Sequence, residues 1–442
     1  MPRHTGAATV ISGLVLACSI TPGHAIEGVH YELKGFASLP AGTFEGEPWS
    51  SGNFVGGSSQ FPSPFPSQPV QGLSGVLAKG NGDYLFLSDN GYGAKANSAD
   101  YALGIYDLTP DFKTAHGGTG TVAINGVVRL SDPNQLFGHP VVADMANYPG
   151  SSIPVAEAIR TNRYLTGWDM DVESIRKDAA GNIWIGDEFG PFLAKFSPQG
   201  ELLAAPVAPA GRVGPDSPTG APATIPGSGG FEGNSSTLDG SKFFAMLEKP
   251  TLADQAAGNR VLEVHEFDPQ SGAYSGTILH YGLSESASAI GDFAPVTDQT
   301  HLVIERDGGH GESAVFKQIY LTDITQTDTE GHLLKEMLVD LMNIPDPHDL
   351  NGDGETTFTF PFVTIEDVVV VDDYTILVAN DNNFPAANGR TAGLADNNEL
   401  ILIGFDQPLS SLQPAPVPVP AAGWLLGSAL AGFVRVAMRK RR

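Results

Sequence analysis

The chain has 442 residues, with 24 Lys and Arg against 50 Asp and Glu, and therefore a formal net charge of −26. Such a surface repels nucleic acid and anionic membranes and suits the binding of cations, so we expect no nucleic-acid partner. The single cysteine, Cys18, lies near the N-terminus, which excludes disulfides and thiol chemistry from the rest of the chain.

Residues 1–25 have the pattern of a secretory signal peptide. Arg3 supplies a basic start, residues 7–20 are mostly apolar, and Gly23-His24-Ala25 offers small residues for cleavage. The alternatives are a buried N-terminal helix or, because Cys18 follows Leu16-Ala17, a lipoprotein signal. The apolar run of about 14 residues is too short to span a membrane, so we predict a removable leader and export.

The next segment, residues 26–410, is predicted to be a single all-β domain. Its many glycines and prolines (53 and 33 in the chain) indicate short strands joined by turns. A repeat is visible: a small residue and an acid, then a turn, then an apolar run that ends in acidic or amide side chains. The copies begin near residues 72, 172, 230, 290 and 364, and each is followed by a further strand. Such units, about 60 to 100 residues apart, are typical of β-propeller blades with loop insertions.

The number of blades is less directly encoded. Five units are visible, the gap between Asn90 and Glu173 has room for another, and residues 29–38 could close the ring as an extra strand of the last blade. We predict six blades, with seven as the alternative; a pair of β-sandwiches is the other fold considered. Residues 206–230 are expected to form an irregular insertion, and residues 156–164 and 333–342 short helices.

Acidic side chains recur at the same point of the repeat. In a propeller the first strand of each blade lines the central channel, so these acids are expected to meet on one face. Many carboxylates lie together only if something neutralises them, and calcium is the hard cation expected outside a cell. The alternative is that each acid fixes a turn by accepting backbone hydrogen bonds. The candidate metal ligands of the repeat are Asp89, Glu173, Asp187, Glu188, Glu232, Glu248, Glu305, Glu366 and Asp381.

A second candidate calcium site lies in residues 349–354. Asp349, Asn351 and Asp353 fit the start of a calcium loop, but Phe360 stands where an EF-hand has its bidentate glutamate. Glu355 could close such a loop instead. The alternative is a plain Asn-Gly turn.

Two basic residues interrupt the acids of the repeat. Arg306 follows Glu305 and Lys249 follows Glu248, and each could receive an anionic substrate group or pair with a neighbouring acid. The sequence contains no Gly-x-Ser-x-Gly elbow, Walker loop or His-Glu-x-x-His motif. Ser74 takes the place of an acid in the first repeat, and we do not expect it to be a nucleophile.

The C-terminus has three parts. Residues 411–420 are a proline-rich linker, residues 421–434 are apolar and compatible with a helix, and a cluster of arginines and lysine closes the chain. This order, with Val417-Pro-Val-Pro-Ala421, resembles the PEP-CTERM/VPLPA-CTERM class of sorting tails. The resemblance implies contact with export and sorting machinery and removal of segment 421–442; a retained single-pass anchor is the alternative. We expect the tail to make the only membrane contact, and the protein to be at the cell surface, outside the cell or in the periplasm.

Five motifs between about residues 70 and 405 carry a further resemblance. They are Gly72-Leu-Ser-Gly with Leu87-Ser-Asp-Asn-Gly, Asp171-Val-Glu-Ser-Ile with Ile185-Gly-Asp-Glu-Phe-Gly-Pro, Gly230-Phe-Glu-Gly, Val303-Ile-Glu-Arg, and Ile365-Glu-Asp with Asn380-Asp-Asn-Asn-Phe-Pro. In this order they resemble the phytase-like family described as "esterase-like activity of phytase". The resemblance implies an exported propeller that hydrolyses phosphoesters or other esters. Glu173-Ser174 and Glu366-Asp367 depart from the family's glutamate-glycine pattern, but the acids remain.

Two functions are compatible with these patterns. The first is a metal-dependent hydrolase of small anionic or ester substrates, in which bound cations activate water. The second is a non-catalytic surface propeller that calcium stabilises and that binds a partner or a polysaccharide. In the first, the candidate catalytic residues are Glu173, Asp187, Glu188, Glu232, Glu366 and Arg306.

Overall fold

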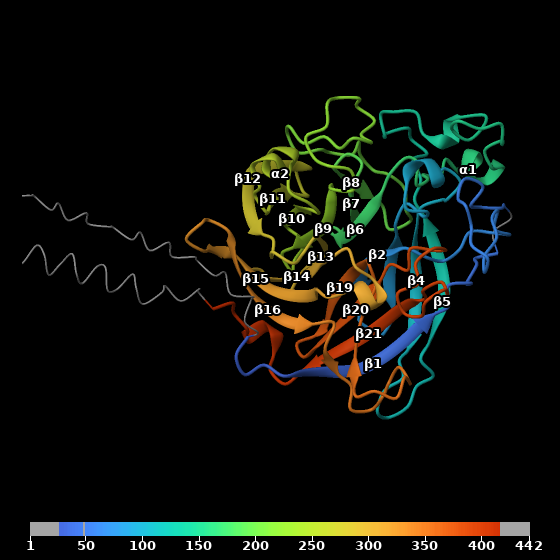
Figure 1. Ribbon diagram of the computed structural model, residues 1–442. Helices are drawn as coiled ribbons and strands as arrows, with labels where there is room; N and C mark the ends of the chain where they lie inside the picture. Colours follow the sequence, from blue (N-terminus) through green and yellow to red (C-terminus); the bar gives the residue numbers. More distant parts are fainter. Residues whose placement is uncertain (1–25, 47–48, 416–442) are drawn as a thin grey trace, which may run out of the picture.

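The computed structural model describes residues 26–46 and 49–415, which form a β-propeller (Figure 1). Each blade is an antiparallel sheet whose first strand lies nearest the axis. The first blade contains β2 (Leu73–Ala78), β3 (Tyr84–Ser88), β4 (Gly104–Asp111) and β5 (Thr121–Arg129), and the second β6 (Val172–Lys177), β7 (Ile183–Asp187) and β8 (Phe192–Phe196). The third contains β9 (Phe231–Ser236), β10 (Phe243–Leu247), β11 (Val261–Asp268) and β12 (Ala273–Gly282), and the fourth β13 (Ala289–Pro295), β14 (Thr300–Arg306), β15 (Lys317–Thr327) and β16 (Leu333–Asp340).

The fifth blade combines the two ends of the domain. It contains β19 (Ile365–Asp372), β20 (Thr375–Asn380), β21 (Asn398–Phe405) and, as its outer strand, β1 (Tyr31–Leu39). β1 pairs antiparallel with β21 from Tyr31 opposite Phe405 to Leu39 opposite Asn398. The predicted closing strand at residues 29–38 is therefore confirmed. β1 also bridges to the first blade, where Ser38 lies opposite Thr121.

The inner strands show that the ring has five blades. β2 contacts β6, β6 contacts β9, β9 contacts β13, β13 contacts β19, and β19 contacts β2 again. The predictions of six and of seven blades are therefore corrected for the part of the chain that the structure describes. The stretch between Asn90 and Glu173 forms outer strands β4 and β5 and an insertion with η2 (Val142–Asp144) and α1 (Glu157–Asn162). Apolar side chains of this insertion, including Val142 and Ile159, join the core of the first two blades.

The small residues of the repeat have a structural reason. Inner strands of neighbouring blades approach so closely that a Cβ atom at Gly291 would lie 1.9 Å from the carbonyl oxygen of Ile365. A Cβ atom at Gly233 would lie 2.6 Å from the Cβ atom of Phe293. Only glycine fits at these positions, so the repeated glycines mark the inner strands.

The predicted helices are only partly present. Residues 156–164 contain α1, as expected, and residues 206–230 form an irregular insertion without α-helix or β-strand. Residues 333–342 instead form β16, which pairs antiparallel with β15, because sheet pairing overrides the helix propensity of this segment. The short helix α2 (Leu252–Ala257) was not predicted; it begins at Thr251, whose hydroxyl accepts the N–H of Asp254. The remaining short elements are η1 (Lys95–Asn97), η3 (Gly311–Ser313), β17 (Ile344–Pro345), β18 (Thr357–Phe358) and η4 (Leu409–Ser411).

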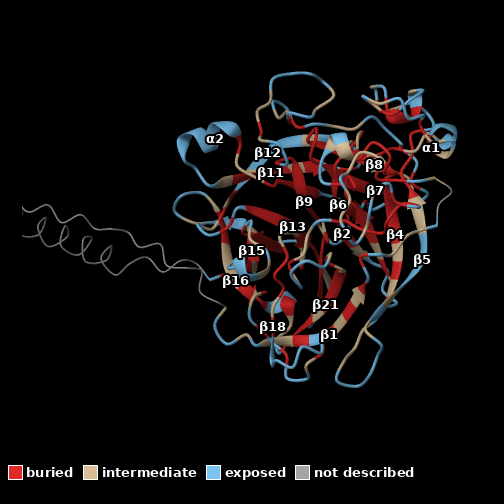
Figure 2. Cartoon of the chain, turned by 45° about the vertical axis from the view of Figure 1, so that its right-hand side comes forward, coloured by how far each residue is buried: buried red, intermediate tan, exposed pale blue. Residues whose placement is uncertain are grey.

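The core lies between the blades, as a separate apolar cluster at each junction of neighbouring blades. Burial is concentrated in the inner strands, whereas α1, α2 and the outer strand β5 are largely exposed (Figure 2). Between the second and third blades, for example, the ring of Trp184 packs on those of Phe243 and Phe267, with centroids 6.0 and 4.9 Å apart. This rigid packing fixes the ends of the inner strands, where the acidic residues of the repeat lie.

Both ends of the described chain are fastened to β16. The amide of Ile26 donates to the carbonyl oxygen of Met337 at 3.0 Å, and the amide of Ala415 donates to Glu336 Oε2 at 2.8 Å. The predicted leader, the second half of the linker (residues 416–420) and the apolar segment 421–442 lie outside the described residues. Within the described ranges, no helix has the length and apolar character that crossing a membrane requires.

Candidate metal and catalytic site

Acidic residues of several blades converge at one end of the inner strands. In each antiparallel hairpin the start of the inner strand lies beside the end of the second strand, as for Val172 and Asp187. Glu173, Glu232 and Glu366 therefore lie near the starts of inner strands, and they meet residues that end or follow second strands. We call the resulting set the central cluster; it comprises Asp171, Glu173, Glu188, Glu232, Glu248, Glu366 and Arg306.

Arg306 holds one side of the central cluster together. Its Nη2 atom lies 2.8 Å from Glu248 Oε1, 3.3 Å from Glu366 Oε1 and 3.5 Å from Glu232 Oε1. Lys249 Nζ lies 2.5 Å from the other oxygen of Glu248. One guanidinium nitrogen is thus shared by three buried carboxylates, which leaves negative charge uncompensated.

The other side of the central cluster has the composition of a cation site. Ligand oxygens of Asp171, Glu173 and Glu188 lie within 4.8 Å of one another, and so do those of Glu188, Glu232 and Glu248. Glu188 belongs to both groups and is only 6% exposed, and its Oε1 atom has no hydrogen-bond partner among residues 26–46 and 49–415. An unpartnered buried carboxylate oxygen is costly unless a cation or another donor binds it.

Burial and mutual repulsion raise the pKa values of the acids in the central cluster. Burial first, and neighbouring carboxylates second, raise the pKa of Glu173, Glu188 and Glu232 well above the usual range. Burial also raises the pKa of Asp171 to about 6 and that of Glu366 to about 8, although Arg306 opposes the shift of Glu366. The fully ionised cluster therefore requires additional positive charge.

Ser74 lies beside the central cluster, and Asp171 belongs to it. Ser74 is buried, and its hydroxyl donates to Glu366 Oε2 at 2.9 Å, so it orients this carboxylate. Asp171 was not among the predicted ligands, and Asn90 Nδ2 donates to its Oδ1 atom at 2.7 Å. Its alternation with Glu173 was visible in the sequence, because residues two apart on a strand point to the same face.

Three predicted ligands hold turns instead of joining the cation groups. Asp89 Oδ1 accepts the N–H of Gly91 at 2.8 Å, and Asp187 Oδ2 accepts that of Gly190 at 2.6 Å. Asp381 Oδ1 accepts that of Asn383 at 2.7 Å. All three are buried, and burial raises the pKa of Asp187 to about 7 and that of Asp381 to about 8. These positions have the geometry of the turn-fixing alternative.

Glu305 is not brought to the central cluster. Adjacent residues of a strand point to opposite faces, so with Arg306 facing the cluster, Glu305 faces away from it. Its carboxylate accepts the hydroxyl of Tyr281 at 2.7 Å and the amide of Ser284 at 3.1 Å, and it pairs with Lys335. The expectation that Glu305 converges with the other acids is therefore wrong.

The predicted calcium loop lies between β17 and β18, and its side chains bind within the loop. Asp349 Oδ1 accepts the N–H of Gly354 at 3.0 Å, and Asp353 Oδ1 accepts that of Glu355 at 2.9 Å. Asn351 Nδ2 donates to Asp353 Oδ2 at 2.7 Å. Both three-ligand groups within the described ranges lie in the central cluster. The contacts of this loop are those of a turn.

The donors of the central cluster fit a hard divalent cation. Its ligands are carboxylate oxygens, which calcium and magnesium prefer, whereas softer metals prefer nitrogen and sulfur. Two three-ligand groups that share Glu188 offer room for one or two ions. The unpartnered Glu188 oxygen and the excess of acids over cations both favour occupancy.

Comparison with solved structures gives only distant matches. A luciferin-regenerating enzyme is 11% identical, with 85% of this chain and 95% of that chain covered and a TM-score of 0.36. An aldose sugar dehydrogenase from Streptomyces coelicolor, in its PQQ-bound form, is 10% identical over 87% and 100% of the two chains, with a TM-score of 0.36. YCF48 from Cyanidioschyzon merolae is 11% identical over 75% and 68%, with a TM-score of 0.30. Such distant similarity says nothing about the activity of this chain.

Comparison with families is more informative. No curated protein matches the chain. The model of the phytase-like family, described as "esterase-like activity of phytase", matches residues 68–384, which include all of the central cluster. The five motifs of the repeat lie almost entirely within this range. The chain therefore belongs to the phytase-like family.

Proposed function

We propose that this protein is an exported hydrolase of phosphoesters or other esters that depends on a divalent cation. The observation that carries the proposal is the central cluster, in which six buried carboxylates share the charges of Arg306 and Lys249. The family description, which names an esterase-like activity, supports ester hydrolysis.

In this proposal Asp171, Glu173, Glu188, Glu232 and Glu248 hold the cation, with calcium as the first candidate. A bound divalent cation polarises a phosphoryl or acyl oxygen and makes a bound water more acidic. Five ligand side chains from two neighbouring blades keep the cation at the meeting point of the inner strands, where the packed core fixes their positions.

Arg306 and Glu366 have separate roles in the proposal. Arg306 donates to Glu248 and Glu366 and forms an ion pair with Glu232, so its loss would leave these three carboxylates without their shared positive charge. Burial raises the pKa of Glu366 to about 8, which makes this carboxyl the candidate general acid for the leaving oxygen. Ser74 fixes the orientation of Glu366.

Export remains part of the proposal. It rests on the leader pattern of residues 1–25 and on the linker, apolar segment and basic end of residues 411–442. Ile26 and Ala415 bind neighbouring residues of β16, so the described chain begins and ends at one place on the propeller. A single attachment point suits a domain that is presented by a sorting tail.

The test is hydrolysis by the full-length chain of a panel of phosphomonoesters and short acyl esters, with calcium and then with a chelator. We expect turnover that chelator abolishes and that Glu173→Gln reduces by about 100-fold or more. Turnover that persists in chelator would contradict metal dependence. Absence of turnover, with thermal stability that still rises with calcium, would favour a non-catalytic propeller that calcium stabilises.

A further inference from the structure

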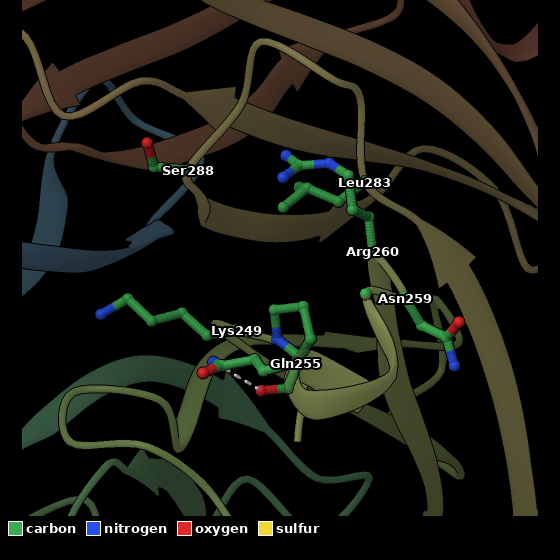
Figure 3. A pocket seen from close by; sticks show the side chains of 8 residues that line it. Lys249, Gln255, Asn259, Arg260, Leu283 and Ser288 are labelled. Carbon is green, nitrogen blue, oxygen red and sulfur yellow. Dashed lines mark hydrogen bonds between the residues drawn. The ribbon is translucent and has the colours of Figure 1, made fainter. Parts of the chain in front are cut away.

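A pocket adjoins the central cluster on the third blade. It lies between α2 and the segment that joins β12 to β13, and its volume is about 380 Å³ (Figure 3). This volume lies within the range of small-molecule sites, about 300 to 1,000 Å³. Lys249, Gln255, Asn259, Arg260 and Ser288 supply its polar lining. Lys249 connects it to the cluster, because its ammonium pairs with Glu248.

The pocket gathers positive charge in a strongly acidic protein. Figure 3 shows Lys249 and Arg260 reaching from opposite sides toward the same open space, with Ser288 at its edge. Arg260 Nη2 donates to two backbone carbonyl oxygens, that of Ser284 at 2.7 Å and that of Ala287. Within the described part of the chain Arg260 forms no ion pair with an acid, so its charge is not neutralised.

The polar groups of the pocket are donors with remaining capacity. A guanidinium carries five N–H groups, and the contacts of Arg260 with the two carbonyls use one nitrogen. Lys249 forms an ion pair with Glu248 and donates one hydrogen to the carbonyl of Ser228, and a protonated lysine has three hydrogens. Gln255 Nε2 uses one hydrogen on the carbonyl of Pro250 at 3.0 Å. This lining matches an anion better than a neutral or cationic ligand.

We propose that this pocket binds an oxyanion, namely a phosphate group carried by the substrate, through Arg260 and Lys249. Guanidinium groups bind tetrahedral oxyanions with two parallel hydrogen bonds, and the hydroxyl of Ser288 and the amides of Gln255 and Asn259 are further donors. The assignment of the anion to a substrate rests on the proposed function. A phosphate held here lies beside Glu248, so the pocket selects phosphorylated esters over neutral acyl esters.

The first test is binding of inorganic phosphate to the full-length chain, measured by calorimetry in chelator so that metals contribute nothing. We expect saturable binding that Arg260→Gln weakens by about tenfold or more, because hydrogen bonds to a charged group are lost. Arg160→Gln on the exposed face of α1 makes the same change in charge and is expected to leave phosphate binding unaltered. Equal affinity in the wild-type and Arg260→Gln chains, or no binding by the wild type, would overturn the proposal.

A second variant is needed because Arg260 also donates to two backbone carbonyls, so that Arg260→Gln could destabilise the fold. Ser288→Glu places a carboxylate at the exposed edge of the pocket and is expected to abolish phosphate binding while the thermal midpoint is retained. With metal present, Arg260→Gln is expected to raise KM for a phosphorylated ester by about tenfold at unchanged kcat, and to leave KM for a neutral ester unchanged. An equal rise for both esters would overturn the subsite. If the wild type binds phosphate but hydrolyses no ester, the proposed function is refuted and the phosphate site is not.

Discussion

Two buried acidic regions of this propeller differ in how their charge is balanced. In the fifth blade Arg390 faces a single acid: its Nε and Nη2 atoms lie 2.9 and 2.6 Å from the two oxygens of Glu399. A third donor of Arg390 binds the carbonyl of Thr359 at 3.0 Å. In the central cluster, by contrast, six carboxylates share the charges of Arg306 and Lys249, and Glu188 Oε1 has no hydrogen-bond partner in the described part of the chain.

This difference distinguishes a structural ion pair from a binding site. A matched bidentate pair satisfies both partners and needs nothing else, as in an ordinary structural ion pair. A group of buried acids without enough cations destabilises the fold until it takes up protons or a metal ion. The central cluster is therefore the part of the molecule whose charge is balanced only when it binds protons or a cation.

The largest expected effect comes from removing the shared cation. Arg306→Gln leaves Glu232, Glu248 and Glu366 without their common donor, and we expect the free energy of unfolding in chelator to fall by about 3–5 kcal/mol. Denaturant unfolding at pH 8 measures this change, with Arg160→Gln as the control. A loss below about 1 kcal/mol would show that the acids are neutralised in another way.

The pH dependence of the free energy of unfolding of the metal-free protein tests the same excess of buried acids over cations. Acids with a raised folded-state pKa stabilise the fold below their unfolded pKa, near 4, and this contribution is lost as the pH rises through the folded values. With Asp171 at about 6 and Glu366 at about 8, we expect the free energy of unfolding to fall by on the order of 5 kcal/mol between pH 5 and pH 8.

Calcium is expected to reverse this trend. Metal ions bind the ionised carboxylates and displace their protons, so the calcium-induced rise in melting temperature should grow from pH 5 to pH 8. Thermal scans at several pH values, with chelator and with calcium, measure the pH dependence of the melting temperature in each state. A calcium effect that is independent of pH would place the ion away from these acids.

A smaller effect is expected at the acids that hold turns. Asp187→Asn weakens hydrogen bonds to the amides of Asp171 and Gly190, and we expect a loss of about 1–3 kcal/mol in the free energy of unfolding. Calcium affinity, measured by calorimetry, should remain the same, because Asp187 is outside both three-ligand groups. A tenfold weaker affinity would identify Asp187 as a ligand after all.

The smallest effect is expected in the loop between β17 and β18. Asp353 is exposed and binds only within its own loop, so Asp353→Asn should change the free energy of unfolding by less than about 0.5 kcal/mol. The calcium stoichiometry of the chain should also be unchanged. Loss of one bound calcium would show that residues 349–354 form a second site.

Much of the fold was predictable because its signals are local. Small residues beside an acid, such as Gly233 and Gly291, identified the inner strands, and the apolar runs after them identified the second strands. Residues 29–38 were correctly expected to close the ring. The blade count was wrong because the length between Asn90 and Glu173 cannot distinguish a blade from an outer-strand insertion. The helix predicted at residues 333–342 was wrong because the segment is a strand that pairs with β15, and this pairing is a long-range interaction.

The candidate site was predictable to a similar degree. The recurrence of acids placed Glu173, Glu188, Glu232 and Glu366 together, but it could not tell ligands from acids that hold turns, because the local pattern of Asp187 serves either role. Glu305 was misplaced because the face of a strand residue depends on register. Arg260 carries no local motif, and only the pocket reveals it.

The most direct test of the central cluster is calcium binding by the full-length chain after chelation, measured by calorimetry at pH 7.5. The wild type should bind calcium, and Glu188→Gln should weaken binding by about 100-fold, since Glu188 is shared by both ligand groups. The control Glu330→Gln changes an exposed acid of the turn between β15 and β16 and should bind as the wild type does. Unchanged affinity in Glu188→Gln, or no binding by the wild type at millimolar calcium, would contradict the assignment of the central cluster as a cation site.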